Sequence, residues 1–436
     1  MLLKSLSIRG LHQTLSLNVE FNPDITLLVG INGSGKTSVL NVIDWLLKPD
    51  LCRLALEKYE SLTLKFEENR ADYTLTAKKS PEILTLSIQG EELHLKPISV
   101  DTRIPVGLDD DQAEERFRGL GPEKHEVPMW ELLQSFSKPT VISLDRTISA
   151  ESDDIQYLEP RSGLLKRRSR ARSPIAYVQE VTSSRYAEFR AKAIANDNEL
   201  KANIVMSALQ DPEVAFRGEA IKPMTREEIA HLEEKVSTYL SATIKSTDVR
   251  KQVRQFFRTS RLLTERQPRR KAGYNFVIDF VVAQYRQIES LAKAFNDFEE
   301  RNAVAFKVLN EYLAAVNRFF NDSNKELFFD ESTGKLAFSS TDVLNQKQIG
   351  QSVAHLSSGE RQILVLFTFL AFASNPKSVF IVDEPELSLH PKWQSDFMDA
   401  FLKLRPEETQ LLLATHSPDI VGNYKQNCVS LRGSKA

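Results

Sequence analysis

The feature that most constrains the fold of this chain is a glycine-rich segment that directly follows a short apolar run. Residues 25–29, Ile-Thr-Leu-Leu-Val, suit a buried strand, and residues 38–47 have the apolar spacing of a helix. Between them the sequence reads Gly30-Ile31-Asn32-Gly33-Ser34-Gly35-Lys36-Thr37, which matches the pattern G-x-x-x-x-G-K-[ST]. Because strand, loop and helix follow in the order that a phosphate loop requires, the sequence predicts an α/β nucleotide-binding fold.

Each residue type in this loop has a physical reason to be there. Glycines let backbone N–H groups close around phosphate oxygens, and the next helix adds the positive end of its dipole. Lys36 is expected to reach the β- and γ-phosphates, and the Thr37 hydroxyl is expected to bind Mg²⁺. The expected nucleotide contacts in this part of the chain are Asn32, Gly33, Ser34, Gly35, Lys36, Thr37 and Ser38.

Two adjacent acids follow a second apolar run, residues 379–382, far along the chain. Asp383 ends this predicted buried strand, where a Mg²⁺-coordinating carboxylate is needed. Glu384 comes next, and strand alternation places it on the other face, where it is positioned to orient or deprotonate the attacking water. The sequence therefore predicts ATP and Mg²⁺ as cofactors, Thr37 and Asp383 as the metal residues, and Glu384 as a catalytic residue for ATP hydrolysis.

Three further segments resemble motifs of one known family. Residues 356–360, Leu-Ser-Ser-Gly-Glu, resemble the signature motif of ABC-type ATPases, and residues 383–391 resemble a Walker B and D-loop run. Residues 414–418, Ala-Thr-His-Ser-Pro, resemble the segment that carries the switch histidine. The combination is similar to the RecF/SMC/OLD branch of ABC ATPases (AAA_15/AAA_21-like), over about residues 1–100 and 350–425.

This resemblance implies a nucleotide site that two copies of the chain complete together. Ser357 and Gly359 of one head would contact the γ-phosphate held by Lys36 of another head, in a head-to-head dimer or a higher homo-oligomer. His416 would sense that phosphate and act in catalysis beside Glu384. The Q-loop of the family has no convincing counterpart in this sequence.

The nucleotide motifs bracket a large insertion, which divides the chain into three expected domains. Residues 1–150 are expected to form an N-terminal ATPase lobe, with antiparallel hairpins between residues 61 and 98. Residues 151–325 are expected to form a helical insertion, and residues 326–436 a C-terminal ATPase lobe. The expected fold class is therefore α/β: an ABC-type P-loop NTPase head with an antiparallel β subdomain and a helical, coiled-coil insertion.

Residues 276–320 have the spacing of one long helix. Apolar residues from Ile288 to Phe319 recur at alternating intervals of three and four, which is heptad-like for over four heptads. Asn302 is the polar exception at a core position, where such a residue can fix the register of a coiled coil. The pattern leaves two alternatives open: a helix packed inside its own domain, or a coiled-coil arm or dimer seam.

The insertion also contains two basic segments, although the net charge of the whole chain is only −2. One is residues 166–172. The other has nine basic residues within 22 positions: Arg250, Lys251, Arg254, Arg258, Arg261, Arg266, Arg269, Arg270 and Lys271. Clustered Lys and Arg neutralise phosphates, so the longer segment is a candidate for contact with nucleic acid. The alternatives are a solvated helical face and an acidic protein partner.

The run D-E-P-E-x-x-L-H-P-x-W-Q, which includes Trp393 and Gln394, resembles small soluble ATPases of bacterial anti-phage systems such as the Septu and PARIS-like pairs. That resemblance implies a sensor and scaffold that responds to DNA or a phage protein and controls a separate nuclease effector of the HNH or TOPRIM type. One alternative is a RecF-like DNA repair or recombination ATPase. Another is an ATP-binding assembly scaffold with little turnover, against which Glu384 argues.

Composition and the chain's ends favour a cytoplasmic protein. A hydrophobic content of 41% with 27% charged residues is ordinary for a globular protein. The N-terminus has no apolar run typical of a secretion signal, and no run of about 18 apolar residues predicts a membrane span. Cys52 and Cys428 lie far apart in the sequence, which fits a reducing compartment and excludes a cysteine-built zinc site within one chain.

Overall fold

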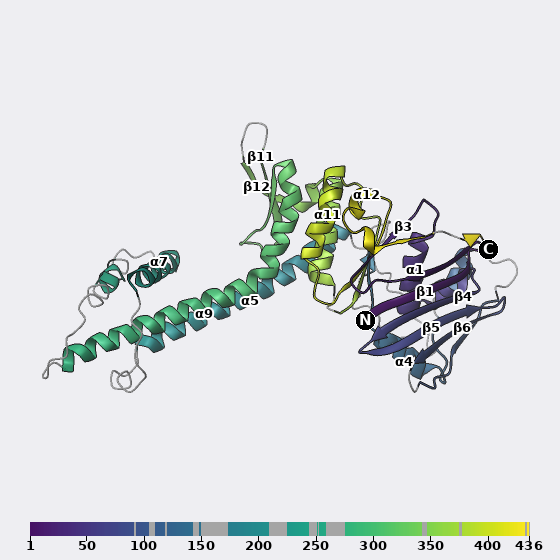
Figure 1. The fold of residues 1–436 in the computed structure, drawn as a ribbon, viewed down its shortest axis with the longest axis horizontal. Coiled ribbons are helices and arrows are strands. Elements are labelled where there is room, and N and C mark those ends of the chain that lie inside the picture. The colour runs from purple at the N-terminus through teal and green to yellow at the C-terminus, as the bar shows by residue number, and fades with distance from the viewer. Residues whose placement is uncertain are drawn as a thin grey trace. The chain divides into compact units, whose positions relative to one another are not determined.

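The protein is described from a computed structural model, and its elements are labelled in Figure 1. The described residues are 1–90, 93–103, 110–117, 120–142, 148–149, 173–208, 225–243, 251, 253–258, 275–341, 347–374, 377–431 and 434–435. The chain divides into two compact units: Met1–Tyr186 with Val308–Ala436, and Ala187–Lys307. The domain boundaries predicted near residues 150 and 325 stay a prediction.

The first unit contains a six-stranded sheet that positions the nucleotide motifs. Its order is β15-β3-β14-β13-β8-β9, and neighbours from β15 to β8 run parallel. The strands are β3 (Ile25–Val29), β8 (Thr140–Ile142), β9 (Ile148–Ser149), β13 (Val379–Asp383), β14 (Gln410–Thr415) and β15 (Cys428–Ser430). In register, Thr415 pairs with Val29 and Ala414 with Asp383, so three strands end at the same edge.

Helices also belong to this unit, and the one predicted from the apolar spacing of residues 38–47 is present. They are α1 (Lys36–Leu47), α2 (Leu51–Leu56), α3 (Asp110–Phe117), α4 (Val127–Ser135), α10 (Ser358–Thr368), α11 (Pro391–Lys403) and α12 (Pro418–Val421). Rings of α10 and α11 interlock, since Phe367 packs edge-on against Phe397 and Phe401. The helix α10 ends at Thr368, and the chain continues as a π-helical turn over Phe369–Ala373.

A seven-stranded antiparallel sheet forms the predicted β subdomain. Its order is β16-β2-β1-β4-β5-β6-β7. The strands are β1 (Leu2–Leu11), β2 (Leu15–Glu20), β4 (Ser61–Glu68), β5 (Ala71–Lys79), β6 (Ile83–Gly90), β7 (Ile98–Asp101) and β16 (Ser434–Lys435). In β4 the residues Leu62, Leu64 and Phe66 are fully buried and alternate with more exposed ones, which is the two-residue period of a sheet with one buried face.

A small third sheet links the long helix α9 (Asn275–Phe320) to the signature segment. After α9 and the short helix η1 (Asn321–Ser323) come β10 (Lys325–Phe329), β11 (Leu336–Thr341) and β12 (Lys347–Ser352), which pair antiparallel in sequence order. A second short helix, η2 (Val353–His355), leads into α10. The strands β10 and β11 thus form a hairpin whose turn comprises residues 330–335.

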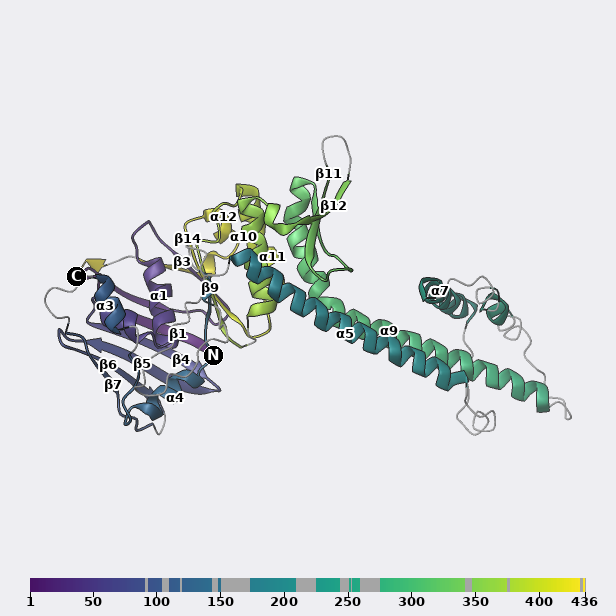
Figure 2. The ribbon, with the colours of Figure 1, turned by 180° about the vertical axis from the view of Figure 1, so that it is seen from behind.

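The second unit is helical. It contains parts of α5 (Pro174–Ala208) and of α9, which lie side by side in Figures 1 and 2, together with α7 (Arg226–Thr243). Asn196 on α5 donates from Nδ2 to Oδ1 of Asn302 at 2.7 Å. The polar core position predicted from the heptads is thus paired within the chain, between antiparallel helices.

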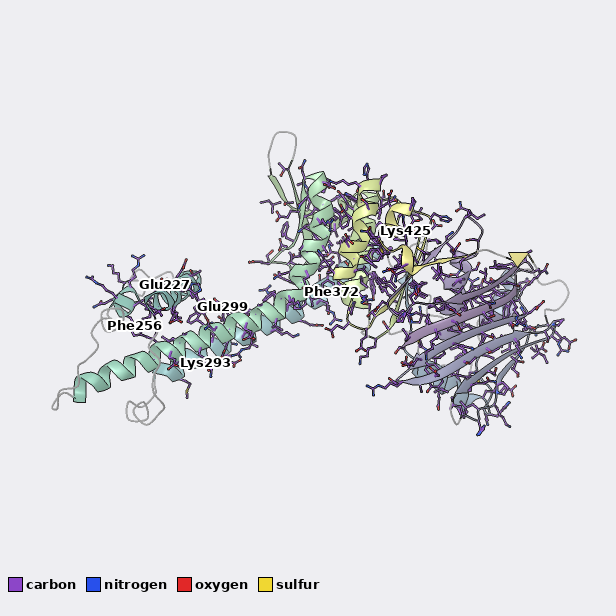
Figure 3. All side chains as sticks on the ribbon, viewed as in Figure 1. Glu227, Phe256, Lys293, Glu299, Phe372 and Lys425 are labelled. Carbon is purple, nitrogen blue, oxygen red and sulfur yellow. The ribbon has the colours of Figure 1, made fainter. Side chains whose placement is uncertain are left out.

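The helix α7 packs against α9 in this unit. Lys235 on α7 forms an ion pair of 2.6 Å with Glu299 on α9, which is labelled in Figure 3. The helix α7 begins with a capping box, since Thr225 and Glu228 exchange hydrogen bonds. Residues 166–172 lie outside the described residues, as does most of the segment 250–271. None of the described helices combines the length and apolar content needed to cross a membrane.

Candidate nucleotide-binding site

The phosphate loop between β3 and α1 has the backbone conformation that its glycines permit. Gly33 and Gly35 have φ values of 80° and 94°, a left-handed region that is costly for other residues. Gly30 is needed for space, because a Cβ there would lie 2.5 Å from Oγ of Ser34. The Ser34 hydroxyl is buried without a hydrogen-bond partner, and Asn32 is exposed at the tip of the loop.

Lys36 lies at the start of α1 with its ammonium group folded toward the loop. Its Nζ donates to the carbonyl oxygens of Gly30, at 3.0 Å, and Ile31, at 3.3 Å, and lies 3.4 Å from Nδ1 of His416. The side chain is only 4% exposed. Burial lowers the pKa of Lys36, and the nearby carboxylates, of which Glu384 has the largest effect, oppose this shift.

Thr37 and Asp383 meet as the sequence predicted for a metal pair. Thr37 donates from Oγ1 to Oδ2 of Asp383 at 2.8 Å, while Oδ1 is buried and has no hydrogen-bond partner. Burial raises the pKa of Asp383 to about 6, the Glu384 charge adds to the rise, and the bond from Thr37 opposes it. A hydroxyl beside an unpaired carboxylate oxygen fits Mg²⁺, which prefers oxygen ligands and keeps several waters. The described residues contain no larger cluster of metal-ligating side chains.

Glu384 and His416 face each other at the ends of β13 and β14. Oε1 of Glu384 lies 3.4 Å from Nε2 of His416. The prediction that Glu384 points to the opposite face of its strand was wrong, because β13 ends at Asp383 and Glu384 has a left-handed φ of 47°. The backbone turn brings both acids toward Lys36, and the Glu384 N–H donates to the Ala414 carbonyl at 2.8 Å.

Glu386 holds the segment that carries His416, a role that sequence reasoning missed. Its Oε1 accepts hydrogen bonds from Oγ1 of Thr415 at 2.8 Å, from the N–H of His416 at 2.6 Å and from the N–H of Ser417 at 3.2 Å. Gln394 on α11 adds a fourth tie, because its Oε1 accepts from Oγ of Ser417 at 2.6 Å. Glu386 and Gln394 belong to the run after Asp383, and the only signal for them in the sequence is the resemblance of that run to a known motif.

The signature residues lie at the N-terminus of α10. Ser357 is the N-cap, and its Oγ accepts from the Glu360 N–H at 3.3 Å. A Cβ at Gly359 would lie 2.6 Å from the carbonyl oxygen of Ser388, so only glycine fits against this part of the D-loop. Within the described residues, no hydrogen bond joins Ser357 to Lys36 or Thr37.

A cavity of about 290 Å³ lies near the phosphate loop, between β1, β2 and the end of β15. Apolar Ile8, Leu17 and Leu431 line it together with polar Arg9 and Asn18. The walls touch the loop itself: a Cβ at Gly35 would meet Leu17, and one at Gly30 would meet the Leu431 carbonyl. The lining of this cavity is thus part apolar and part polar.

Comparison with known proteins identifies the family. Residues 1–421 match the AAA ATPase domain (AAA_15). The chain belongs to this family. Its motifs and relatives are those of an ABC-type ATPase of the RecF/SMC branch, as the sequence predicted.

Two relatives illustrate the similarity of this AAA ATPase domain. The chain is 34% identical over 143 residues to a DNA double-strand break repair Rad50 ATPase from Archaeoglobus fulgidus. That alignment covers 27% of this chain and only 16% of the relative's length. The structure is similar to the Smc head domain with an extended coiled coil from Pyrococcus furiosus, solved with the C-terminal domain of ScpA. The TM-score is 0.37 with 11% identity, covering 99% of this chain and 94% of that one.

Proposed function

We propose that this protein is a Mg²⁺-dependent ATPase that uses ATP binding and hydrolysis as a switch. The observation that carries the proposal is the meeting of Lys36, Thr37, Asp383, Glu384 and His416 at one edge of the parallel sheet. Few structural roles explain a buried carboxylate oxygen without a partner beside a phosphate loop.

In this proposal each residue has one task. The backbone of the loop and Lys36 hold the triphosphate, and Thr37 and Asp383 would hold Mg²⁺, which neutralises charge that develops on the phosphates. Glu384 orients and deprotonates the attacking water, and His416 contacts the γ-phosphate. Nucleotide binding then replaces the contacts of Lys36 with Gly30 and Ile31 by contacts with phosphate oxygens.

The switch would require a second copy of the chain. Ser357 and Gly359 are held at the start of α10 and make no bond to the phosphate loop within the described residues. Supplied by another head, they would complete the wall of the site around the γ-phosphate. ATP would then act largely as an adhesive between heads, and an isolated head would hydrolyse slowly.

For the cellular role we propose an anti-phage sensor and scaffold that controls a separate nuclease effector of the HNH or TOPRIM type. The support is the resemblance of residues 383–394 to ATPases of such systems. Glu386 and Gln394 of this run accept hydrogen bonds from His416 and Ser417. The run therefore helps to position His416, the proposed sensor of the γ-phosphate. The proposed trigger is DNA or a phage protein.

A RecF-like role with direct DNA binding is the second candidate. Lys251, Arg254 and Arg258 are exposed at helical spacing in the second unit, and Phe257 between them is buried in that unit's core. A similar protein is named for DNA double-strand break repair. Charge reversal of these three residues should abolish salt-dependent DNA binding if this candidate is correct; absence of binding at about 50 mM salt would refute it.

Mass photometry of wild type and Glu384→Gln, with and without Mg-ATP and duplex DNA, tests the proposal. ATP-dependent association, prolonged in Glu384→Gln, is the expected result. A fixed oligomer larger than a dimer that ignores DNA favours the sensor and scaffold role. Capture of DNA by an ATP-dependent dimer favours the RecF-like role, and a protein that neither binds nor hydrolyses ATP would refute both.

A further inference from the structure

The start of α10 contains a buried carboxylate to which the hydrolysis scheme gives no task. Glu360 is 2% exposed. Lys325 donates from Nζ to both of its oxygens, at 2.9 and 2.8 Å, and Ser323 donates from Oγ to Oε1 at 2.7 Å. Burial alone would raise the pKa of Glu360, but the bonds from Lys325 and Ser323 outweigh it and lower that pKa. Glu360 is therefore charged, and its ion pair with Lys325 offsets the free-energy cost of burying that charge.

This carboxylate is also bonded to the signature serine. Oε2 of Glu360 accepts from the Ser357 N–H at 2.8 Å, and the Glu360 N–H donates back to Oγ of Ser357 at 3.3 Å. The two bonds form a capping box, which fixes both the backbone and the hydroxyl of Ser357. A shift of Glu360 would therefore move Ser357 with it.

The segment that supplies Lys325 supports the signature from a second side. Lys325 begins β10, two residues after the end of η1. From η1, Asp322 accepts hydrogen bonds from Nζ of Lys392 at 2.6 Å and from Nε1 of Trp393 at 2.9 Å. The Trp393 ring lies 3.6 Å from where a Cβ of Gly359 would be. The segment that follows the long helix α9 thus contacts Glu360 within the signature motif and Trp393 beside it.

We propose that Lys325 is a positioning residue for ATP hydrolysis, and that it acts through Glu360 to aim Ser357 at the γ-phosphate held by a second copy of the chain. The inference rests on the proposed function, since it assumes a composite site. It assigns to the third sheet a task that no nucleotide motif reveals. It also predicts that loss of Lys325 harms the partner's site and leaves the chain's own phosphate loop intact.

The test is complementation between two defective heads. Lys325→Met should keep its affinity for a fluorescent ATP analogue within about twofold, yet lose ATP-dependent association and about 10- to 100-fold in kcat, because small misplacements at a reacting centre have effects of this size. Lys36→Ala removes the phosphate loop function but leaves Ser357 in place. Mixing the two should restore hydrolysis, since each mixed dimer contains one site with both intact halves.

Three controls make the outcome decisive. Lys325→Arg should recover most of the activity, and Lys335→Met, at the exposed far turn of the same hairpin, should behave as wild type. If Lys325→Met does not fold, the double variant Lys325→Met with Glu360→Gln is used in the mixing test instead, because it no longer buries an unpaired charge. Full activity of Lys325→Met or of the double variant, or no recovery on mixing, would overturn the inference alone. An inactive wild type would overturn the proposed function as well.

Discussion

At the scale of single residues, the site is dominated by charge held away from water. Asp383 is 5% exposed, has one hydrogen bond and lies beside two other acids, Glu384 and Glu386. Without metal or nucleotide such a cluster is electrostatically strained, and Lys36 only partly compensates it. Binding of Mg-ATP should therefore stabilise the protein strongly.

This strain predicts a pH dependence of stability in the metal-free protein. The pKa of Asp383 is raised from 3.8 to about 6, so between roughly pH 4 and 6 the folded state keeps a proton that the unfolded state has released. Stability contributed by this group should therefore fall as the pH rises through that window. Asp383→Asn should raise the free energy of unfolding at pH 8 by about 2–3 kcal/mol and by less at pH 5, measured by urea titration in EDTA. Equal effects at both pH values would contradict the assignment.

A second residue-scale prediction concerns the glycine of the signature. Gly359→Ala brings a Cβ within 2.6 Å of the Ser388 carbonyl, and a backbone oxygen cannot move as a side-chain tip can. We expect kcat to fall about 10- to 100-fold with unchanged binding of a fluorescent nucleotide. Gly121→Ala is the matched control, because no atom lies within 4 Å of its added Cβ. Wild-type turnover by Gly359→Ala would contradict the requirement for glycine at the contact with the Ser388 carbonyl.

At the scale of elements, local patterns predicted much of the fold. The strand alternation in β4, the loop between β3 and α1, and the long helix α9 were all visible in the sequence, because each depends on neighbours a few residues away. The pairing of β14 between β3 and β13 was not, because parallel neighbours are joined by long connections. Glu386 could not be assigned for the same reason: its partners Thr415 and Ser417 lie 29 and 31 residues away.

The tie between the β13 loop and the end of β14 can be tested at Glu386. Glu386→Ala leaves the His416 N–H and the Thr415 hydroxyl without the acceptor that Glu386 provides, although the Ser417 N–H still donates to Oγ1 of Thr415. The His416 ring should therefore lose its fixed place. We expect kcat to fall about tenfold or more with little change in KM. Glu386→Gln keeps an acceptor oxygen and should retain most activity. A KM effect that exceeds the kcat effect would argue for a role in binding instead.

The helix pair of the second unit gives another element-scale prediction. Replacing Asn302 alone by Leu leaves Asn196 without its 2.7 Å partner and should lower the free energy of unfolding by about 1–2 kcal/mol. Replacing both by Leu should restore wild-type stability to within about 1 kcal/mol, because an apolar pair suits a heptad core. Thermal unfolding of the single and double variants measures this, and additive losses would contradict the pairing.

At the scale of the whole molecule, the separation of the signature from the phosphate loop predicts an activity that depends on concentration. Turnover per chain should rise with protein concentration and level off once association is complete. The measurement is steady-state hydrolysis across a dilution series, with mass photometry at each point. Full-rate hydrolysis by a sample shown to be monomeric would contradict the composite site.

The strand order also has a consequence for synthesis. The antiparallel sheet draws β1, β2 and β4 to β7 from residues 2–101, so most of it can pair soon after these residues leave the ribosome. In the parallel sheet formed by the described residues, β3 lies between β14 and β15, which begin at residues 410 and 428. The phosphate loop therefore adjoins an incomplete sheet until residues 410–430 have been made. A nascent chain that lacks residues 410–430 would have neither His416 nor the strands on the two sides of β3, and we expect it not to bind ATP as the folded protein would.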